Sequence, residues 1–364
     1  MLTYDNYKLS EVDYEKILNK FSTKANLNRI IIVANVYGET KHYVCPKEQL
    51  RIEFFNEQEI NEIKNSLRKA GYDFITYYDE HKFIQDVEAK RLLIQDDDLV
   101  FNLSRNGKGI SKKSFIPTYC DYYNFKYTGS CGYACSLARN KKHVSELLLQ
   151  NNLHGLKSWA YNGKWQLDCK PPKNVEVIIK PLYESASRGI KSDCITNTSN
   201  DYFDQIVKNK YTELNVPLVI QQFIRGYECK VPIFVLDDIT AFDPIGICID
   251  NVKLLNDKII TQDLSYHYSY KDFLLSECFS ENIIEEIKTN AKKVFELIGM
   301  ENYGRIDCRI TPDGNFYFYD FATMPYFTKH SELTYLFTKN GLNQSALFNV
   351  IFNSALITKY NYNV

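Results

Sequence analysis

The chain has 364 residues, of which 45% are hydrophobic and 24% are charged, as in a soluble globular protein of roughly two or three packed units. Its formal net charge is −1, which excludes the strongly basic surface typical of proteins that bind nucleic acid or anionic lipid. Residues 1–10 are polar, unlike a secretory signal, and no apolar run is long enough to span a membrane. The ten cysteines include no C-x-x-C pair, so we expect reduced thiols, no zinc site and a cytoplasmic protein.

The first third of the chain alternates strand-like and helical segments. Apolar runs at residues 29–36 and 98–103 fit buried parallel strands, and residues 125–129 fit a short strand that ends in glycine. Between the two runs, residues 57–70 have the apolar spacing of a helix, which Gly71 would end. This alternation predicts an open α/β layer.

The remaining two thirds mix strands and helices in another order. Residues 140–151 and, most clearly, residues 281–298 have helical spacing. Residues 175–181 predict a strand that ends in a Lys-Pro step, and residues 217–226 predict a second strand that ends at a glycine.

A β-hairpin is predicted near the end of this part. Two alternating strands, residues 303–310 and 316–321, surround the sequence PDGN at residues 312–315, a strong turn signal. A turn of two or four residues places Asp307 directly opposite Asp320. A turn of three residues would shift this register.

The hairpin carries residue types that suit a metal and a phosphate. Because strand side chains alternate, Arg305, Asp307 and Asp320 project from one face. Two opposed carboxylates repel each other, and a hard divalent cation such as Mg²⁺ between them would relieve the repulsion. Arg305 could hold a phosphate beside the cation. The alternative is that Arg305 forms a salt bridge with the two acids, or that both acids point to solvent.

Two further segments suit a nucleotide. Lys180 ends the strand at residues 175–181 and precedes a small, polar loop at residues 184–189, as suits phosphate binding; a lysine that reaches solvent from the strand end is the alternative. Residues 221–224 lead to Glu228, so their backbone could bind an adenine edge while Glu228 accepts hydrogen bonds from ribose. The alternative there is an ordinary edge strand with a surface glutamate.

The order of these segments resembles that of the D-alanine–D-alanine ligase branch of the ATP-grasp superfamily. The resemblance runs from about residue 99 to about residue 333. The segments that carry it are YTGS at 127–130, SLARNK at 136–141, IIKP at 178–181, VIQQFIRGYE at 219–228, GRID at 304–307, YDFATMP at 319–325 and TKHS at 328–331.

This resemblance implies an α/β protein with the ATP-grasp fold, in which two α+β subdomains clasp ATP. The N-terminal open α/β domain would span residues 1–126, the central subdomain residues 127–217, and the C-terminal subdomain, with the metal and substrate site, residues 218–364.

The resemblance also implies the roles of particular residues, with ATP and Mg²⁺, or Mn²⁺ in its place, as cofactors. The catalytic residues would be Arg305, which steadies an acyl phosphate, and Lys180. The implied ATP-binding residues are Lys141, Lys180, Glu184, Ser187, Gln221, Gln222, Phe223, Ile224 and Glu228; the metal ligands are Asp307 and Asp320; the substrate-binding residues are Tyr326 and Ser331.

Several positions depart from the family pattern. Ala322 replaces a metal-binding asparagine, and the shorter Asp320 replaces a glutamate. Ala186 replaces a substrate-contacting serine, and Tyr326 replaces a glycine that lies close to the reacting carbonyl. No lid lysine can be assigned, although Lys258, His267 or Lys271 could substitute for it.

We therefore expect an enzyme, an ADP-forming ligase that joins a carboxylate to an amine through an acyl phosphate. The departures predict amino-acid-like substrates other than D-Ala plus D-Ala, as in specialised metabolism. The alternative is a catalytically weak or inactive ATP-binding regulator of the same fold. We expect small-molecule substrates as its partners, with neither nucleic acid nor membrane, and leave a homodimer open.

Overall fold

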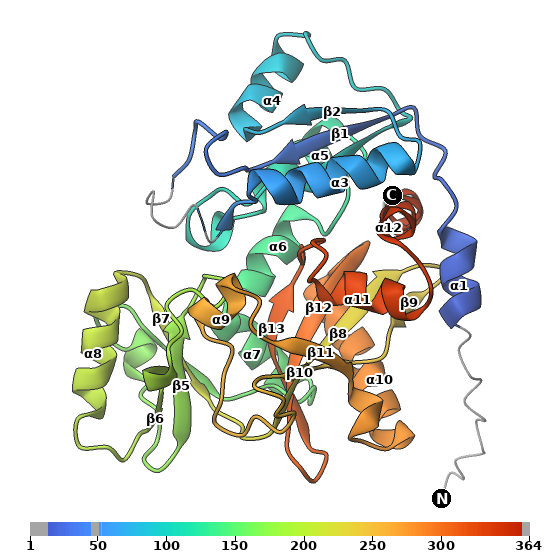
Figure 1. Cartoon of the computed structure of the whole chain (residues 1–364). Helices are drawn as coiled ribbons and strands as arrows, with labels where there is room; N and C mark the ends of the chain where they lie inside the picture. The colour runs from blue at the N-terminus through green and yellow to red at the C-terminus, as the bar shows by residue number, and fades with distance from the viewer. Residues whose placement is uncertain (1–13, 45–50, 52, 359–364) are drawn as a thin grey trace, which may run out of the picture.

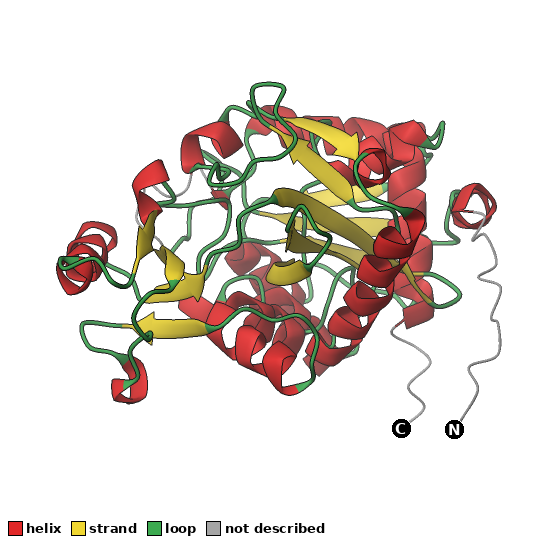
Figure 2. Ribbon diagram, turned by 90° about the horizontal axis from the view of Figure 1, so that it is seen from below, coloured by secondary structure: helices red, strands yellow, loops and turns green. Residues whose placement is uncertain are grey.

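The computed structural model describes residues 14–44, 51 and 53–358. Within these residues the chain forms three β-sheets: an N-terminal sheet, a central sheet and a larger C-terminal sheet (Figure 1). Helices lie mainly outside the strands (Figure 2). No helix in the described ranges is long and apolar enough to cross a bilayer.

The N-terminal sheet is parallel, with the strand order β2-β1-β3. Its central strand is apolar after Arg29, because both faces of the strand are covered. Ile30 and Ile32 pack with α3 and α12, whereas Ile31 and Val33 pack with α4 and α5. The bounds are β1 Arg29–Ala34, α3 Glu57–Lys69, β2 Phe74–Tyr77, α4 Glu80–Glu88, β3 Asp98–Leu103 and α5 Phe115–Tyr123.

Two strand predictions are wrong: one segment forms no strand, and the other forms a shorter one. Residues 125–129 form no strand; Tyr127 makes only an isolated bridge to Val100, after which the chain turns at Gly129 with φ +88°. Residues 217–226 do not form one strand, since β7 ends at Gln222. Beyond it the backbone turns at Gly226 (φ +153°), where a Cβ atom would lie 1.9 Å from a carbonyl oxygen, so only glycine fits.

The central sheet is antiparallel, with the order β4-β7-β5-β6. The helix α8 (Phe203–Leu214) packs on it through Phe203 and Val207. β7 belongs to this sheet, although the predicted subdomain boundary lies between residues 217 and 218; the division into domains remains a prediction. The strand bounds are β4 Ser158–Tyr161, β5 Glu176–Pro181, β6 Ile195–Asn197 and β7 Leu218–Gln222.

The C-terminal sheet has the order β11-β10-β8-β12-β13, with β9 paired to β8. The helix α10 (Glu281–Ile298) has the predicted bounds and buries Ile287, Ala291 and Val294 in the same core as this sheet. The strand bounds are β8 Tyr227–Val235, β9 Ile239–Ala241, β10 Ile245–Cys248, β11 Lys271–Leu274, β12 Tyr303–Ile310 and β13 Phe316–Ala322.

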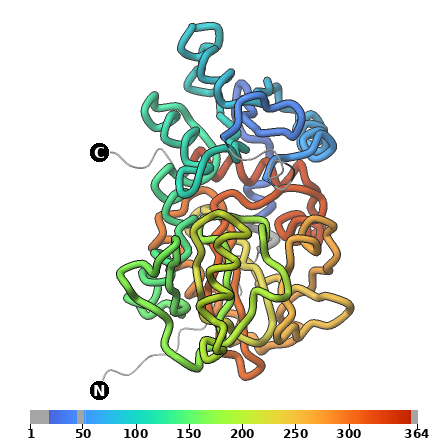
Figure 3. Tube along the Cα trace, turned by 90° about the vertical axis from the view of Figure 1, so that its left-hand side faces the viewer, coloured from blue at the N-terminus to red at the C-terminus, as the bar shows by residue number. Residues whose placement is uncertain are grey.

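A shared core joins the N-terminal sheet to the C-terminal part of the chain. Phe101 of β3 packs edge-to-face against Phe348 and Phe352 of α12. In the tube view, the red C-terminal segments accordingly lie beneath the blue N-terminal ones, and the green central sheet forms the lower front (Figure 3). The other helices are α1 Tyr14–Phe21, α6 Gly132–Arg139, α7 Lys141–Gln150, α9 Gln262–Tyr266, α11 Glu332–Lys339 and α12 Gln344–Thr358.

Candidate active site

A cavity of about 740 Å³ is lined by side chains from the central and C-terminal sheets and by residues outside the strands of the N-terminal part. It brings together residues that are far apart in the sequence. Every residue predicted to bind ATP, metal or substrate lines it: Lys141, Lys180, Glu184, Ser187, Gln221, Gln222, Phe223, Ile224, Glu228, Arg305, Asp307, Asp320, Tyr326 and Ser331.

The β12–β13 hairpin has the predicted register at the site but a different turn. Asp307 faces Asp320, and Arg305 faces Ala322. Near the turn, however, Ile310 faces Phe316, because the turn has three residues and ends at Gly314 with φ +94°. A β-bulge between these two regions adds one residue to β13 and restores the pairing of the two aspartates.

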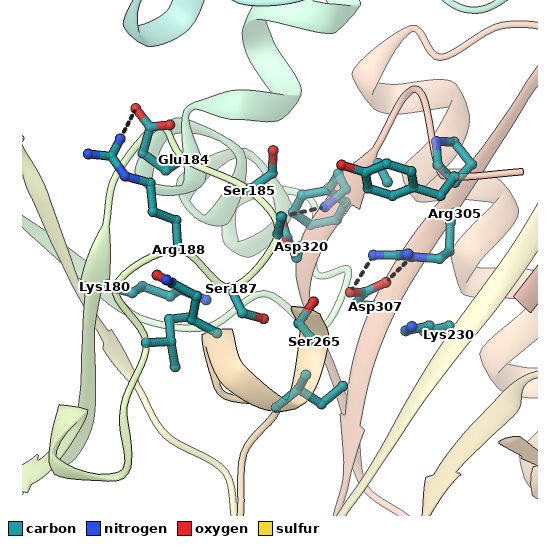
Figure 4. A pocket seen from close by; sticks show the side chains of 18 of the residues that line it. Lys180, Glu184, Ser185, Ser187, Arg188, Lys230, Ser265, Arg305, Asp307 and Asp320 are labelled. Atoms are coloured by element: carbon teal, nitrogen blue, oxygen red, sulfur yellow. Dashed lines mark hydrogen bonds and ion pairs between the residues drawn. The ribbon is translucent and has the colours of Figure 1, made fainter. Parts of the chain in front are cut away.

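Arg305 is held in a buried charge network. It donates two hydrogen bonds to Asp307, at 2.6 and 2.9 Å, and one to Glu332 at 2.8 Å. Lys230 lies 3.5 Å from the other oxygen of Glu332. Figure 4 shows Arg305 and Asp307 side by side at one wall of the cavity. The salt-bridge alternative is therefore correct for Asp307, which is buried and does not point to solvent, but Asp320 takes no part in it.

Asp320 faces a second pair of charges across the cavity. Burial would raise the pKa of Asp320, but Lys141 and Lys180 outweigh this effect and hold it below its usual value. For Asp307, burial, reinforced by the charge of Asp320, raises the pKa to about 6. The two carboxylates therefore repel each other, as the hairpin register predicts.

The pair of aspartates fits a magnesium ion that is shared with a nucleotide. Among the described residues there is no group of three or more His, Cys, Asp or Glu side chains placed to hold a metal. Mg²⁺ is commonly held by one or two carboxylates together with substrate phosphates and water, so Asp307 and Asp320 are sufficient protein ligands.

Lys180 lies at the end of β5, inside the cavity wall. Its side chain is buried, and its ammonium lies 4.9 Å from the ring centroid of Tyr319, so it does not reach bulk solvent. Burial lowers the pKa of Lys180 to about 8. Lys141 begins α7 and donates to the carbonyl oxygen of Glu184 at 2.5 Å, which ties it to the loop after β5.

That loop has an unusual backbone. Ala186 and Ser187 both have positive φ, 54° and 52°, which is uncommon for residues with a Cβ atom. Glu184 anchors the loop, since its carboxylate accepts from Lys112 at 2.5 Å and pairs with Arg188 at 3.2 Å. Ser187 is thereby presented to the cavity beside Lys180 (Figure 4).

The segment after β7 forms another wall. Gln221 donates from its side-chain amide to Ser145 at 2.9 Å, while Gln222, Phe223 and Ile224 line the cavity. The backbone N–H groups of Gln222 and Phe223 already form hydrogen bonds within the protein. They donate to the carbonyl oxygens of Lys157 and Glu176.

Glu228 has two partners that sequence reasoning missed. It accepts a hydrogen bond from Arg309 at 3.1 Å and from the hydroxyl of Tyr319 at 2.9 Å. Arg309 could have been found, because alternation along β12 puts it on the same face as Arg305 and Asp307. Tyr319 could not, because it faces the cavity beside Asp320 only through the bulge.

The two predicted substrate residues differ in their surroundings. The ring of Tyr326 is half-buried, with the guanidinium of Arg105 3.8 Å from its centroid and Phe55 edge-on at 5.6 Å. Ser331 caps the start of α11, accepting from the backbone N–H of Thr334 at 3.2 Å.

The candidates for a lid lysine do not reach the cavity. Lys258 and Lys271 are exposed, as is His267, and none of these side chains lines it. The same segment instead contributes Ser265, Tyr266 and Tyr268 to the wall.

Comparisons with known proteins agree with this arrangement. The family described as D-ala D-ala ligase C-terminus matches residues 156–353, more than half of the chain. A D-alanine–D-alanine ligase of Thermotoga petrophila is 21% identical over 299 residues, which cover 81% of this chain and 90% of the relative. One from a Marinomonas species is 25% identical over 300 residues, covering 80% and 88%.

Solved structures show the same fold. The D-alanine–D-alanine ligase of Bacillus anthracis complexed with ATP superposes with a TM-score of 0.64 at 16% identity, covering 90% of this chain and 97% of that one. The ligase of Coxiella burnetii gives a TM-score of 0.62 at 14% identity, covering 91% and 94%.

Proposed function

This chain belongs to the D-alanine–D-alanine ligase family of ADP-forming ATP-grasp ligases, and we propose that it joins two amino-acid-like substrates other than D-Ala plus D-Ala. ATP and Mg²⁺ are its cofactors. The observation that carries the proposal is that one cavity is lined by all the residues predicted for phosphate, metal, adenine and substrate.

In the first step, a carboxylate oxygen of one substrate attacks the γ-phosphorus of ATP, and the bond to the β-phosphate breaks to release ADP. Lys141 and Lys180 would hold the phosphates, and Asp307 and Asp320 would hold Mg²⁺, which would supply positive charge against the phosphates. Because Lys180 is buried, little water competes with the phosphates for its ammonium.

In the second step, the amine of the other substrate attacks the acyl carbon, phosphate leaves, and the amine proton passes to solvent. Arg305 steadies the phosphate and the developing oxyanion. Its guanidinium is already oriented by Asp307 and Glu332, so little side-chain freedom is lost when it binds.

The wall around Tyr326 argues against the small D-Ala pair. An aromatic ring backed by Arg105 and Phe55 occupies the position of the family's glycine, and Ala186 offers no hydroxyl to a substrate. A buried polar group of a substrate left unpaired costs about 1–3 kcal/mol, or roughly tenfold to a hundredfold in discrimination.

A second candidate is an ATP-binding regulator without ligase activity. Two observations favour it: Ala322 provides no metal ligand, and no lysine from residues 258–271 lines the cavity.

The test is ADP release by the purified protein with ATP, Mg²⁺ and a panel of L- and D-amino acids, singly and in pairs. We expect ADP and phosphate as products, dependent on added amino acid, and a new amide by mass spectrometry. AMP with pyrophosphate would refute the acyl-phosphate route. D-Ala alone as the best substrate would refute the specificity, and ATP binding without amino-acid-dependent turnover would favour the regulator.

A further inference from the structure

A cluster of cations lines the cavity on its N-terminal side, beside Tyr326. Its members are Arg105, Lys113 and Arg139, none of which the sequence analysis assigned to the site. They come from the loop after β3 and from the last residue of α6, which meet at this wall.

Hydrogen bonds and close backbone packing fix the loop that carries Arg105 and Lys113. The side-chain oxygen of buried Asn35 accepts from the backbone N–H groups of Arg105 and Asn106, at 2.5 and 2.9 Å. Gly107 has φ +122°, and a Cβ atom there would lie 2.7 Å from the Cα atom of Lys112. Lys113 then takes a left-handed backbone with φ 67°, which is strained for a lysine. The loop is thus fixed in place rather than free on the surface.

The two adjacent lysines of this loop differ in their pairing. Lys112 is paired twice, with Glu184 at 2.5 Å and with Glu53 at 3.3 Å. Lys113 is 8% exposed, and in the part of the chain that the structure describes it makes neither a hydrogen bond nor an ion pair through its side chain. A charged ammonium on a largely buried side chain is unfavourable without a counter-charge. An anion bound in the cavity would supply that counter-charge.

The charges around Lys113 are mainly of the same sign. Burial lowers the pKa of Lys113 well below its usual value, and Arg105 and Arg139 lower it further, against the single carboxylate of Glu53. Arg105 and Arg139 each also keep a buried Nε–H without a hydrogen-bond acceptor. The positive charges of Arg105 and Arg139 therefore add to that of Lys113 at this wall of the cavity.

In the proposed function, the ATP phosphates bind to other lysines of the cavity. They lie with Lys141 and Lys180 opposite Asp320, whose pKa both lysines lower. Arg105, in contrast, stacks on Tyr326, the residue expected to contact substrate. This contact favours a substrate over ATP as the source of an anion at Lys113.

We propose that Lys113, Arg105 and Arg139 bind an anionic side chain of one of the two joined substrates, a carboxylate or a phosphate beyond the carboxylate that is activated. This inference rests on the proposed ligase function and names its substrate class. An ionised side chain would accept a charge-assisted hydrogen bond from Lys113 and would be attracted by Arg105 and Arg139, whereas its neutral amide would leave the charge of Lys113 unpaired.

The first experiment compares the KM values of acidic substrates with those of matched neutral ones. Aspartate, glutamate and phosphoserine are tested against asparagine, glutamine and serine, by ADP release, in both enantiomers. We expect the acidic member of the best pair to have a KM at least about tenfold lower. Preference for phosphoserine or for a dicarboxylic amino acid distinguishes the two kinds of anion.

The variant Lys113→Met then removes the charge and keeps the bulk of the side chain. We expect its KM for the acidic substrate to rise at least about tenfold and its KM for ATP to stay unchanged, while Lys113→Arg retains the preference. The matched control is Lys108→Met, an exposed lysine of the same loop outside the cavity wall, which should change neither constant.

Three results decide against the inference: neutral substrates used as well as acidic ones, a preference unchanged in Lys113→Met, or a rise in the KM for ATP alone. If no amino acid supports ADP release, the ligase proposal fails, and binding is measured directly by thermal unfolding with glutarate, glutaramide or inorganic phosphate. Stabilisation of the wild type but not of Lys113→Met by an anion would still support the anion site, and no stabilisation by any anion would refute it.

Discussion

The substitution Lys180→Met tests the proposed phosphate site through stability as well as activity. Lys180 is buried and, among the described residues, its ammonium donates no hydrogen bond; burial lowers its pKa from 10.5 to about 8. This difference corresponds to about 3 kcal/mol by which the folded protein disfavours the charged form. Methionine keeps most of the volume and removes the charge, so the free variant should be more stable by up to that amount. For a chain of this length we expect an increase in Tm of about 4 °C.

The pH dependence of that gain follows from the direction of the pKa shift. A lysine with a lowered pKa in the folded state destabilises the protein fully below its folded pKa, near 8. The destabilisation fades as the pH rises from 8 to 10.5, where the lysine is neutral in both states. The gain in Tm of Lys180→Met should therefore be largest at pH 7 and lost near pH 10.5.

The assay pairs thermal unfolding without ATP with initial rates of ADP release. Turnover should fall at least about a hundredfold, because the phosphates lose a desolvated cation. The matched control is Lys173→Met, an exposed lysine just before β5, which should alter neither quantity. Turnover near that of the wild type would refute the phosphate role of Lys180, and an unchanged Tm at pH 7 would refute the argument from burial.

Three further predictions concern acidic side chains. Asp307→Asn and Asp320→Asn should each weaken Mg²⁺-dependent ATP binding, with a less than additive double variant, as measured by calorimetry across Mg²⁺ concentrations; wild-type Mg²⁺ dependence in both single variants would contradict a shared ion. Glu228→Gln should raise the KM for ATP and lower Tm, because Arg309 loses its carboxylate; an unchanged KM would remove Glu228 from the nucleotide site. Burial raises the pKa of Asp272 to about 6, and its Oδ1 lacks a partner, so Asp272→Asn should stabilise the protein by about 1–2 kcal/mol above pH 6 and not below pH 4; no such pH dependence in Tm would contradict the shift.

The sequence predicted best the elements whose packing leaves a complete pattern in a short window. β3 and α10 have the predicted bounds, because β3 is buried along its whole length and α10 buries a regular helical stripe. The same reasoning was wrong for residues 125–129, which form no strand, and gave too long a strand for residues 217–226. Their apolar character is real, but whether such a run becomes a strand depends on available partner strands, which lie far away in the sequence.

The hairpin shows how a local error can be compensated at the site. The turn has three residues instead of two or four, which alone would have separated Asp307 from Asp320. The bulge that restores their pairing leaves no recognisable mark in the sequence. The opposition of two carboxylates was nonetheless predictable, since their alternation with Arg305 indicated one polar face on otherwise apolar strands.

Sequence reasoning missed the cations of the cavity wall for a different reason. Lys113 and Lys112 are neighbours in one loop, and nothing in the sequence distinguishes them; Glu53 and Glu184, which lie far away in the chain, pair with Lys112 and leave Lys113 unpaired. Burial makes that difference significant, because an exposed lysine without a partner is ordinary, whereas a buried lysine without one is unfavourable. The substrate class that we propose therefore rests on the charge of Lys113, which the fold leaves unpaired in the same cavity as the proposed ATP site.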